Sequence, residues 1–371
     1  MNNFLQMCYS GDLKKIQEHL QSDISILNQT SLTGESPLHI AVKRNNIQLC
    51  IILLEKKIDY NAKNFVGLTP LMMSCKYKNP AVTKLLLQQD SIQVNTKDIS
   101  GKTAPMYAVE SNCVSCINLL SEDSLFWTVN WNERDFLQET APMKALKYSS
   151  EELVREILKI DTIDWSMGDI EGYTGPMIAI KRNLIFALKL FENKTDINWN
   201  AVNHMGQSVV MIAIENKREF CMKLLTQIKS ISWNQQDSHF NTPVMFALQN
   251  KSINCLNIIQ HLPFIDWNIS NINKETALSI SLNINDNDFF YILLQKDIKC
   301  TEVLKMHNLQ QKALLKTLTY VKNLSTSHHK SVKMNTYCAL IYALENDLHS
   351  IIVEILISGL RKASKKKLLY I

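Results

Sequence analysis

The stretch DINWNAVN, residues 196–203, carries a Trp–Asn pair that recurs at a fixed interval along the chain. Five of the 6 tryptophans in the 371 residues are 34 positions apart, and each is followed by Asn or Ser. They are Trp131, Trp165, Trp199, Trp233 and Trp267. A rare, bulky residue at constant spacing indicates an internal repeat, and a period of roughly 20–50 residues is typical of solenoids, propellers and arrays.

Two further residue types keep the same register. A Ser or Thr stands nine residues after each of these tryptophans, and the series continues upstream at Ser36, Thr69 and Thr103. A small residue follows each hydroxyl residue five positions later, from Ala41 to Ser281. Hydroxyl residues cap helix N-termini, and two closely packed helices need a small side chain where they cross. Each unit is therefore predicted to form a capped helix, a turn, a second helix and an extended return. One such unit cannot bury its own apolar face, so neighbouring units must stack.

The stretches TGESPLHIAV (33–42) and GLTPLMMSC (67–75) resemble the T-P-L-H-x-A signature of ankyrin repeats, whose period is about 33 residues. The resemblance implies an all-α fold, an α-solenoid of stacked ankyrin-type helix-turn-helix repeats with β-hairpin loops. We therefore expect a repeat array with an N-terminal capping unit over residues 1–300. Residues 301–371 are expected to form degenerate C-terminal helical repeats and a basic tail.

The chain departs from this signature at the His position and at the turn glycine, and each departure predicts a local structural difference. The signature His survives only as His39, and later units place Met there, which exchanges polar bridging between repeats for flexible apolar packing. The turn glycine of the hairpin is replaced by Gln138, Phe240 and Lys274 in three units. We expect those three side chains to stand at a left-handed backbone position that favours glycine.

The bulk composition excludes several function classes. With 46% hydrophobic and 20% charged residues the chain is typical of a folded soluble protein. A net charge of +5 spread over this length gives no reason to expect a membrane partner and makes nucleic acid an unfavoured one. The 9 cysteines are scattered, which favours a reducing compartment. A cytoplasmic location is expected, with a nuclear one as the alternative because of the basic KASKKK run.

Chemistry-bearing motifs are not evident. The sequence has no Gly-rich phosphate loop and no nucleophile elbow, so we expect neither an enzyme nor a bound cofactor. Cys113-x-x-Cys116 resembles half of a zinc or redox motif. Cys116, however, falls in a periodic column with Leu49 and Val82, which favours a small buried hydrophobe and no metal. The tryptophans themselves are either a buried structural ladder or a platform on which nucleobases stack.

The predicted partner surface combines the hairpin tips with the last turn of each first helix. Apolar residues such as Phe65, Val66 and Ile99 recur at the tips, where they either form a docking strip or fold back onto neighbouring hairpins. Basic and aromatic residues recur at the helix ends, which favours an acidic segment with apolar anchors. The candidate partner-binding residues are Lys43, Arg44, Tyr77, Phe136, Leu137, Lys147, Tyr148, Ile170, Lys181, Arg182, His204, Met205 and Phe240.

The function expected from these patterns is a non-catalytic protein–protein interaction scaffold or adaptor. Its partner, another protein, would bind on the concave groove that the resemblance implies. Two alternatives remain open. One is recognition of a small molecule or nucleotide by the aromatic and basic groove residues, and the other is a ubiquitin-ligase-type adaptor acting through the C-terminal helices.

Overall fold

The computed structural model describes residues 3–122, 126–284, 289 and 292–293. The chain divides into two compact units, residues 1–204 and residues 205–371. The predicted boundary at residue 300, and the helices and basic tail predicted for residues 301–371, lie outside the described residues.

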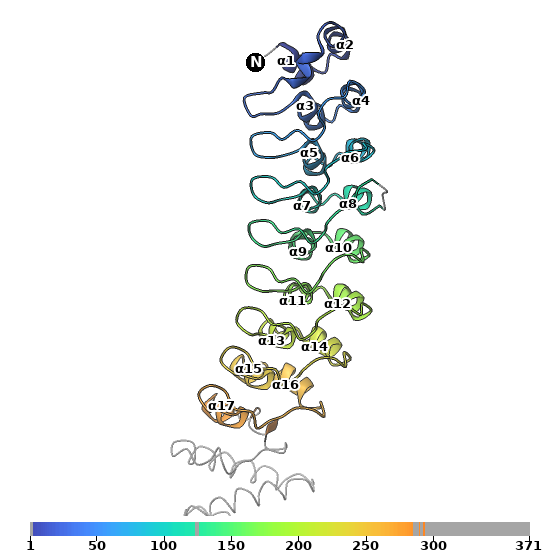
Figure 1. Ribbon diagram of the computed structural model, residues 1–371. Coiled ribbons are helices and arrows are strands. Elements are labelled where there is room, and N and C mark those ends of the chain that lie inside the picture. Colours follow the sequence, from blue (N-terminus) through green and yellow to red (C-terminus); the bar gives the residue numbers. More distant parts are fainter. Residues whose placement is uncertain (1–2, 123–125, 285–288, 290–291, 294–371) are drawn as a thin grey trace, which may run out of the picture. The chain divides into compact units, whose positions relative to one another are not determined.

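Unit 1 is a stack of helical pairs with loops that project to one side (Figure 1). The first helices pack on one another in one column and the second helices in another. The helices are α1 (Asn3–Ser10), α2 (Leu13–Ser22), the 3-10 helix η1 (Ile24–Asn28), α3 (Pro37–Lys43), α4 (Ile47–Glu55), α5 (Pro70–Lys76), α6 (Pro80–Leu87), α7 (Ala104–Glu110), α8 (Val114–Ser121), α9 (Ala141–Tyr148), α10 (Glu151–Leu158), α11 (Gly175–Lys181) and α12 (Ile185–Glu192).

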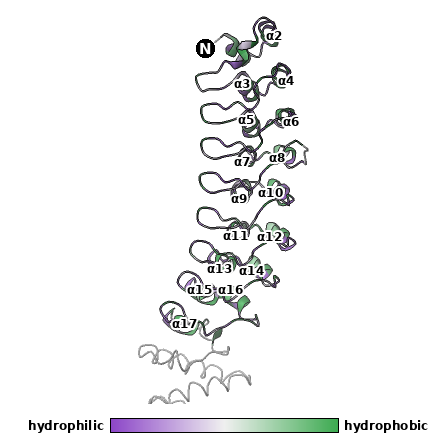
Figure 2. Cartoon of the chain, viewed as in Figure 1, coloured by the Kyte–Doolittle hydropathy of each residue, from purple (hydrophilic) through white to green (hydrophobic). Residues whose placement is uncertain are grey.

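Unit 2 repeats the same arrangement. Its described helices are α13 (Val209–Glu215), α14 (Glu219–Leu225), α15 (Pro243–Gln249), α16 (Ile253–Ile259) and α17 (Ala277–Ile284). In both units the helices carry hydrophobic and hydrophilic residues together, as expected for helices that bury one face (Figure 2). The predicted all-α solenoid of helix-turn-helix repeats is confirmed.

The periodic residues take the structural roles that their spacing predicted. Each hydroxyl residue from Ser36 to Thr242 is the N-cap of a first helix, and in four of these seven helices its side chain accepts the N–H of the third helical residue. The small residue five positions later is fully buried in every repeat, from Ala41 to Ser281. First helices of adjacent repeats can therefore approach closely, because no bulky side chain separates them.

The five periodic tryptophans belong to the core. Their side chains are between 3% and 8% exposed. In unit 1 the Trp165 ring meets the Phe191 ring edge to face, with 4.9 Å between centroids. A buried indole offers no face to a nucleobase, so the structural interpretation of the tryptophan spacing is confirmed and the stacking-platform alternative is wrong for these rings.

An Asn at the position after Trp131 and after Trp233 joins its repeat to the next. Asn132 Nδ2 donates to the Thr162 carbonyl oxygen at 3.0 Å, and Asn132 Oδ1 accepts from the Asp164 N–H at 2.8 Å. Asn61 and Asn95 in unit 1 and Asn234 in unit 2 make the same pair of bonds to the following repeat. Ser166 holds this position in the next repeat and bonds to Asp164 of its own loop instead. This amide clamp explains why the sequence repeats Trp–Asn rather than Trp alone.

Six of the hairpin loops are closed by a carboxylate or amide that the sequence analysis did not single out. Asp135 Oδ1 accepts from the N–H groups of Leu137 and Glu139, each at 2.9 Å. The equivalent pair of bonds is made by Asn64, Asp98, Asp169, Asp237 and Asn271. A fixed Asp or Asn four residues after each Trp was the available signal. In the loops predicted as β-hairpins these side-chain bonds close the turn, and Ser270 and Thr276 also form an antiparallel bridge.

The substituted turn positions behave as predicted. Gln138, Phe240 and Lys274 have φ angles of 58°, 60° and 60°, in the left-handed region that Gly67 and the other turn glycines occupy. The signature His that survives as His39 also bridges two repeats as predicted, because His39 Nε2 lies 2.8 Å from the Leu68 carbonyl oxygen of the next repeat. The methionines at the equivalent positions, from Met72 to Met245, are buried.

Backbone hydrogen bonds also connect successive hairpin tips. The N–H of the tip residue donates to a carbonyl oxygen of the preceding hairpin at 3.0–3.2 Å. The pairs are Phe65 to Thr33, Ile99 to Val66, Phe136 to Ser100 and His204 to Glu171 in unit 1, and Ser238 to Met205 and Ile272 to His239 in unit 2.

Restoring the missing amide clamp should stabilise unit 1. Ser166→Asn places an amide where, by the register of Asn132, it faces the Asp196 carbonyl and the Asn198 N–H. We expect the free energy of unfolding to rise by about 1 kcal/mol, since each exposed hydrogen bond contributes roughly 0.5–1.5 kcal/mol. The reciprocal variant Asn132→Ser should lower it by a similar amount. Urea unfolding of both variants measures this, and unchanged midpoints in both would show that the clamp contributes nothing.

The hairpin carboxylates should make stability depend on pH. Burial alone would raise the pKa of Asp98, but hydrogen bonds from the Tyr107 hydroxyl and the Lys102 N–H outweigh it and hold this pKa below its ordinary value. A carboxylate whose folded-state pKa is lowered stabilises the fold above its unfolded-state pKa, about 3.9. That contribution is lost as pH falls through the folded-state pKa.

Asp98→Asn is the variant that isolates this charge, because Asn64 makes the same two backbone bonds at the same place in its own hairpin. We expect it to be less stable than the parent by about 1 kcal/mol at neutral pH, because hydrogen bonds to charged groups are the stronger ones. The difference should shrink as pH falls below the unfolded-state pKa and vanish once Asp98 is protonated in the folded state as well. Urea unfolding at a series of pH values tests this, and a difference independent of pH would contradict it.

Candidate functional site

The hairpin tips carry the exposed apolar row that the sequence predicted. In unit 1 Phe65, Ile99, Phe136 and Ile170 are 59–73% exposed. The other predicted tip residues are also exposed, namely Val66, Leu137 and His204 in unit 1 and Met205, His239 and Phe240 in unit 2. Their exposure makes them accessible to a partner.

Some of these tips also fold back onto a neighbouring hairpin. The Phe65 ring lies against Gly34, so that a Cβ on Gly34 would stand 2.5 Å from Phe65 Cδ1. The Phe136 ring lies against Gly101 in the same way, and the His204 ring against Gly172. Both interpretations of the tips therefore hold in part: one side of each ring packs on the chain and the other remains exposed.

The predicted basic residues at the helix ends are less available than the sequence suggested. Lys43 Nζ lies 2.9 Å from Glu35 Oε1, and the Arg44 guanidinium donates to the Tyr9 carbonyl oxygen. Lys147 Nζ lies 2.6 Å from Glu139 Oε1 and 2.7 Å from Asp169 Oδ2. Burial would lower the pKa of Lys147, but these two carboxylates outweigh it and raise this pKa above its ordinary value. Lys43 and Lys147 therefore bring little net charge to the surface.

Lys147 belongs to a larger network that sequence reasoning missed. Lys144 is almost fully buried, and its Nζ lies 2.8 Å from Asp135 Oδ2 and 2.9 Å from Glu139 Oε2. Glu110 connects the network to Lys102 of the preceding repeat. A signal was present, because the repeats on either side place Tyr107 and Ile178 at the position of Lys144. A buried cation held by several carboxylates stabilises this part of the chain only while every partner stays in place.

Four of the predicted residues meet in one cleft of unit 1. Lys147, Tyr148, Lys181 and Arg182, from the ends of α9 and α11, line a cavity of about 280 Å³. Asp169, Glu171, Tyr173 and Ile178 complete its lining. We call it the α9–α11 cleft. The remaining predicted residues of unit 1 lie outside it: Lys43, Arg44 and Tyr77 at α3 and α5, and Phe136, Leu137, Ile170 and His204 at the tips.

The α9–α11 cleft combines aromatic surface with charges of both signs. Tyr148 is 69% exposed, while Tyr173 and Ile178 are buried. Lys181 Nζ stands 4.3 Å from the centroid of the Tyr173 ring, which places the ammonium against an aromatic face. The lining carries three cations, Lys147, Lys181 and Arg182, and two carboxylates, Asp169 and Glu171. The cleft therefore favours a ligand group of single negative charge.

The cysteine pair that resembled half of a metal or redox motif is buried in the described part of the chain. The described residues contain no group of three or more His, Cys, Asp or Glu side chains placed to hold a metal ion. Cys116 is buried in the predicted seam, 2.9 Å from Cys113. The hydrogen bond from Cys113 lowers the pKa of Cys116, but Cys75 and burial outweigh it and raise this pKa to about 12. The Cys116 thiol is therefore not ionised at neutral pH.

None of the described helices is both long enough and apolar enough to span a bilayer.

Known proteins share this fold. Residues 4–98 and 58–135 match the sequence model of the family described as ankyrin repeats (3 copies). The solved ankyrin-repeat domain of Bcl-3, a member of the IkappaB protein family, superimposes with a TM-score of 0.54 at 23% identity. That alignment covers 61% of this chain and 99% of the Bcl-3 domain. At such identity the likeness concerns the fold alone.

Longer proteins of several kinds share segments with the chain. A probable E3 ubiquitin-protein ligase of Oryza sativa subsp. japonica is 30% identical over 114 residues, which is 30% of this chain and 22% of the relative. The transient receptor potential cation channel subfamily A member 1 of Homo sapiens is 31% identical over 99 residues, 27% of this chain and 9% of the relative. Rabankyrin-5 of Mus musculus is 23% identical over 155 residues, 42% of this chain and 13% of the relative. The chain thus covers less than a quarter of each of these relatives.

Repeats of this type are generally protein–protein interaction modules and typically non-catalytic. The helical pairs, the hairpin loops and the matched residues agree with one another: the described part of the chain has the ankyrin-repeat fold, and residues 4–98 and 58–135 match the ankyrin-repeat family.

Proposed function

We propose that this chain is a non-catalytic scaffold that docks an acidic segment of another protein in the α9–α11 cleft. The observation that carries the proposal is the meeting of Tyr148, Lys181 and Arg182 around one cavity. Tyr and Arg are the side chains most often found as binding hot spots. The excess of one positive charge over the negative ones suits a single Asp or Glu side chain rather than a long acidic tract.

Apolar anchors for the same partner are available at the nearby tips. Phe136, Leu137 and Ile170 are each more than half exposed, and they belong to the hairpins that lead into α9 and α11. A segment that fills the cleft with an acidic side chain could place apolar residues on these tips. Such a mixed surface, with an aromatic centre and a polar rim, is typical of protein interfaces.

The two alternatives have less support. Recognition of a small molecule or nucleotide by the aromatic and basic groove residues cannot use the periodic tryptophans, which are buried, and would depend on exposed rings such as Tyr148. The adaptor hypothesis depends on residues 301–371, which lie outside the described residues. Relatives named as E3 ubiquitin-protein ligases motivate it, but their matches with this chain cover only 22% and 27% of the two rice proteins.

A double variant on the cleft tests the proposal. Arg182→Glu with Tyr148→Ser removes one cation and one exposed ring without touching the buried network around Lys144. We expect the affinity for a partner captured by the wild-type chain from its native cells to fall at least about tenfold, as for hot-spot residues. Thermal melting should hardly change, because surface substitutions alter the free energy of unfolding by about 0.5 kcal/mol or less.

Lys189→Glu is the matched control, since it makes the same charge change on the exposed surface of α12 in the same repeat. It should leave partner affinity unchanged. Affinities measured by calorimetry at two salt concentrations add a second readout, because the wild-type complex should weaken with salt more than the variant complex. Undiminished binding by the double variant would show that the partner docks elsewhere.

A further inference from the structure

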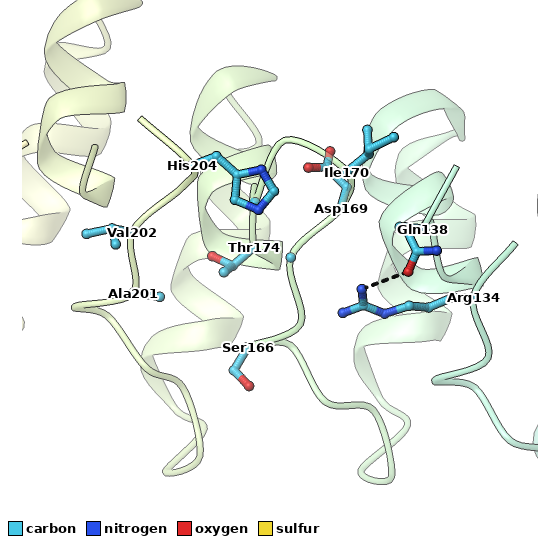
Figure 3. A pocket seen from close by; sticks show the side chains of 11 residues that line it. Arg134, Gln138, Ser166, Asp169, Ile170, Thr174, Ala201, Val202 and His204 are labelled. Carbon is cyan, nitrogen blue, oxygen red and sulfur yellow. Dashed lines mark hydrogen bonds between the residues drawn. The ribbon is translucent and has the colours of Figure 1, made fainter. Parts of the chain in front are cut away.

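A second cleft of unit 1 lies among three successive hairpins (Figure 3). Its volume is about 430 Å³, within the range of small-ligand and peptide sites. Arg134 and Gln138 line it from one hairpin, Ser166, Gly168 and Thr174 from the next, and Ala201, Val202 and His204 from the third. We call it the Gly168 cleft. It shares Asp169 with the α9–α11 cleft, but it is lined by the hairpin arms that lead in from the second helices.

The Gly168 cleft exists because this repeat lacks a bridging side chain. At the equivalent positions Lys63 Nζ donates to the Lys97 carbonyl oxygen at 3.1 Å, and Lys97 Nζ donates to the Arg134 carbonyl oxygen at 3.0 Å. Gly168 cannot continue this series, because a Cβ there would stand 2.9 Å from the backbone of Gly172. Glycine in an extended arm often marks a place where a ligand or another backbone approaches closely.

Arg134 supplies a positive charge at one end of the cleft. It is half-buried, and its Nη1 donates to Gln138 Oε1 at 3.2 Å (Figure 3). None of the carboxylates in the described part of the chain forms an ion pair with it. Its Nε–H and Nη2 groups form the planar fork that carboxylates accept from. This end of the cleft therefore suits an anion.

Thr174 supplies an unused hydroxyl between Arg134 and the Ala201–Val202 side of the cleft (Figure 3). Its side chain is 3% exposed, and Oγ1 has no hydrogen-bond partner. Thr69, Thr140 and Thr242 instead accept the N–H of the third helical residue at the same position of their own repeats. A buried hydroxyl without a partner costs free energy that a ligand group can recover.

The hairpin that contains Gly168 also has a backbone N–H group that is not bonded to the preceding hairpin. Phe65, Ile99, Phe136 and His204 bond through their N–H to the preceding hairpin, whereas Ile170 makes no such backbone bond in the described residues. Gly168 has no side chain to cover its own peptide groups. A backbone running past them could form main-chain hydrogen bonds, as in other extended-peptide sites.

We propose that the Gly168 cleft binds an extended peptide that places an Asp or Glu carboxylate on Arg134 and a backbone group on Thr174 Oγ1. This site is independent of the function proposed for the α9–α11 cleft. Ala201 and Val202 provide the apolar flank against which the peptide lies.

Glycine-selective NMR tests the proposal on the full chain. The sequence has 9 glycines, so ¹⁵N-glycine labelling gives few backbone signals, and two of them, Gly168 and Gly172, line the cleft. Carbonyl-¹³C glutamate identifies Gly172, because Glu171 is the one Glu followed by Gly. Titration with acetyl-Ala-Ala-Glu-Ala-Ala-amide should shift Gly168 and Gly172 and leave Gly34 and Gly67 unmoved. The peptide with Gln in place of Glu should bind at least about tenfold more weakly, because it loses a charged hydrogen bond.

Three variants make the test specific. Arg134→Gln should weaken binding of the Glu peptide about tenfold or more, whereas Lys63→Gln, at the same hairpin position away from the cleft, should not. Thr174→Val should weaken binding severalfold while leaving thermal stability equal or higher, because it removes an unsatisfied hydroxyl. A fall in stability would instead assign that hydroxyl to the helix cap and overturn its role in binding.

Other results of the NMR titration would overturn the proposal or assign the cleft to another ligand. Absence of shifts at Gly168 and Gly172 with millimolar Glu peptide, or equal binding of the Glu and Gln peptides, would overturn the proposal. Tighter binding of inorganic phosphate than of the Glu peptide would assign the site to a phosphate group instead. The Arg182→Glu, Tyr148→Ser double variant should still bind the Glu peptide, so failure at one cleft is distinguishable from failure at the other.

Discussion

An amide clamp joins successive repeats at four places in the described units, and at two of them, Asn132 and Asn234, a buried indole precedes the amide. The indole is buried beside the helices, and the amide of the following Asn bonds to two backbone groups of the next repeat. A single repeat has too little apolar surface to fold alone, so its stability depends on such nearest-neighbour contacts. A constant period suits this joint, because the amide meets the same two backbone groups of the next repeat wherever the spacing is kept.

Several departures from the repeat pattern lie close together in unit 1. Ser166 lacks the clamp, Gly168 lacks the bridging side chain, and Gln138 stands at a turn position that favours glycine. Lys144 is buried where neighbouring repeats place apolar residues. Both clefts are found in the same segment. Both clefts therefore lie where the side-chain pattern of the repeats is interrupted.

Several charged side chains of the first helices form ion pairs or hydrogen bonds within the chain, so they are less available to a partner. The carboxylates that close the hairpins use one oxygen for backbone N–H groups, and several offer the other oxygen to a lysine or tyrosine of a first helix. Lysines that look like surface cations in the sequence are thereby fixed and neutralised. The lining of the α9–α11 cleft carries one more positive than negative charge, with Lys147, Lys181 and Arg182 against Asp169 and Glu171.

The sequence by itself determined the parts of this protein that repeat. The first helices and their caps, the buried small residues, the buried tryptophans and the left-handed positions of Gln138, Phe240 and Lys274 all follow from register. A repeated position meets the same neighbours in every repeat, so one pattern predicts one environment. The exposure of the hairpin tips followed from the same register.

Only the tertiary structure decided which side chains reach across to the next repeat. The pairing of Lys147 with Asp169, the burial of Lys144 and the opening at Gly168 depend on side-chain lengths in two or three adjacent repeats at once. Register gives the position of each of those residues but not the distance between their charged atoms. Because Coulomb interactions and hydrogen bonds act over a few ångströms, these distances decide whether a cation is neutralised by its own chain or left for a partner.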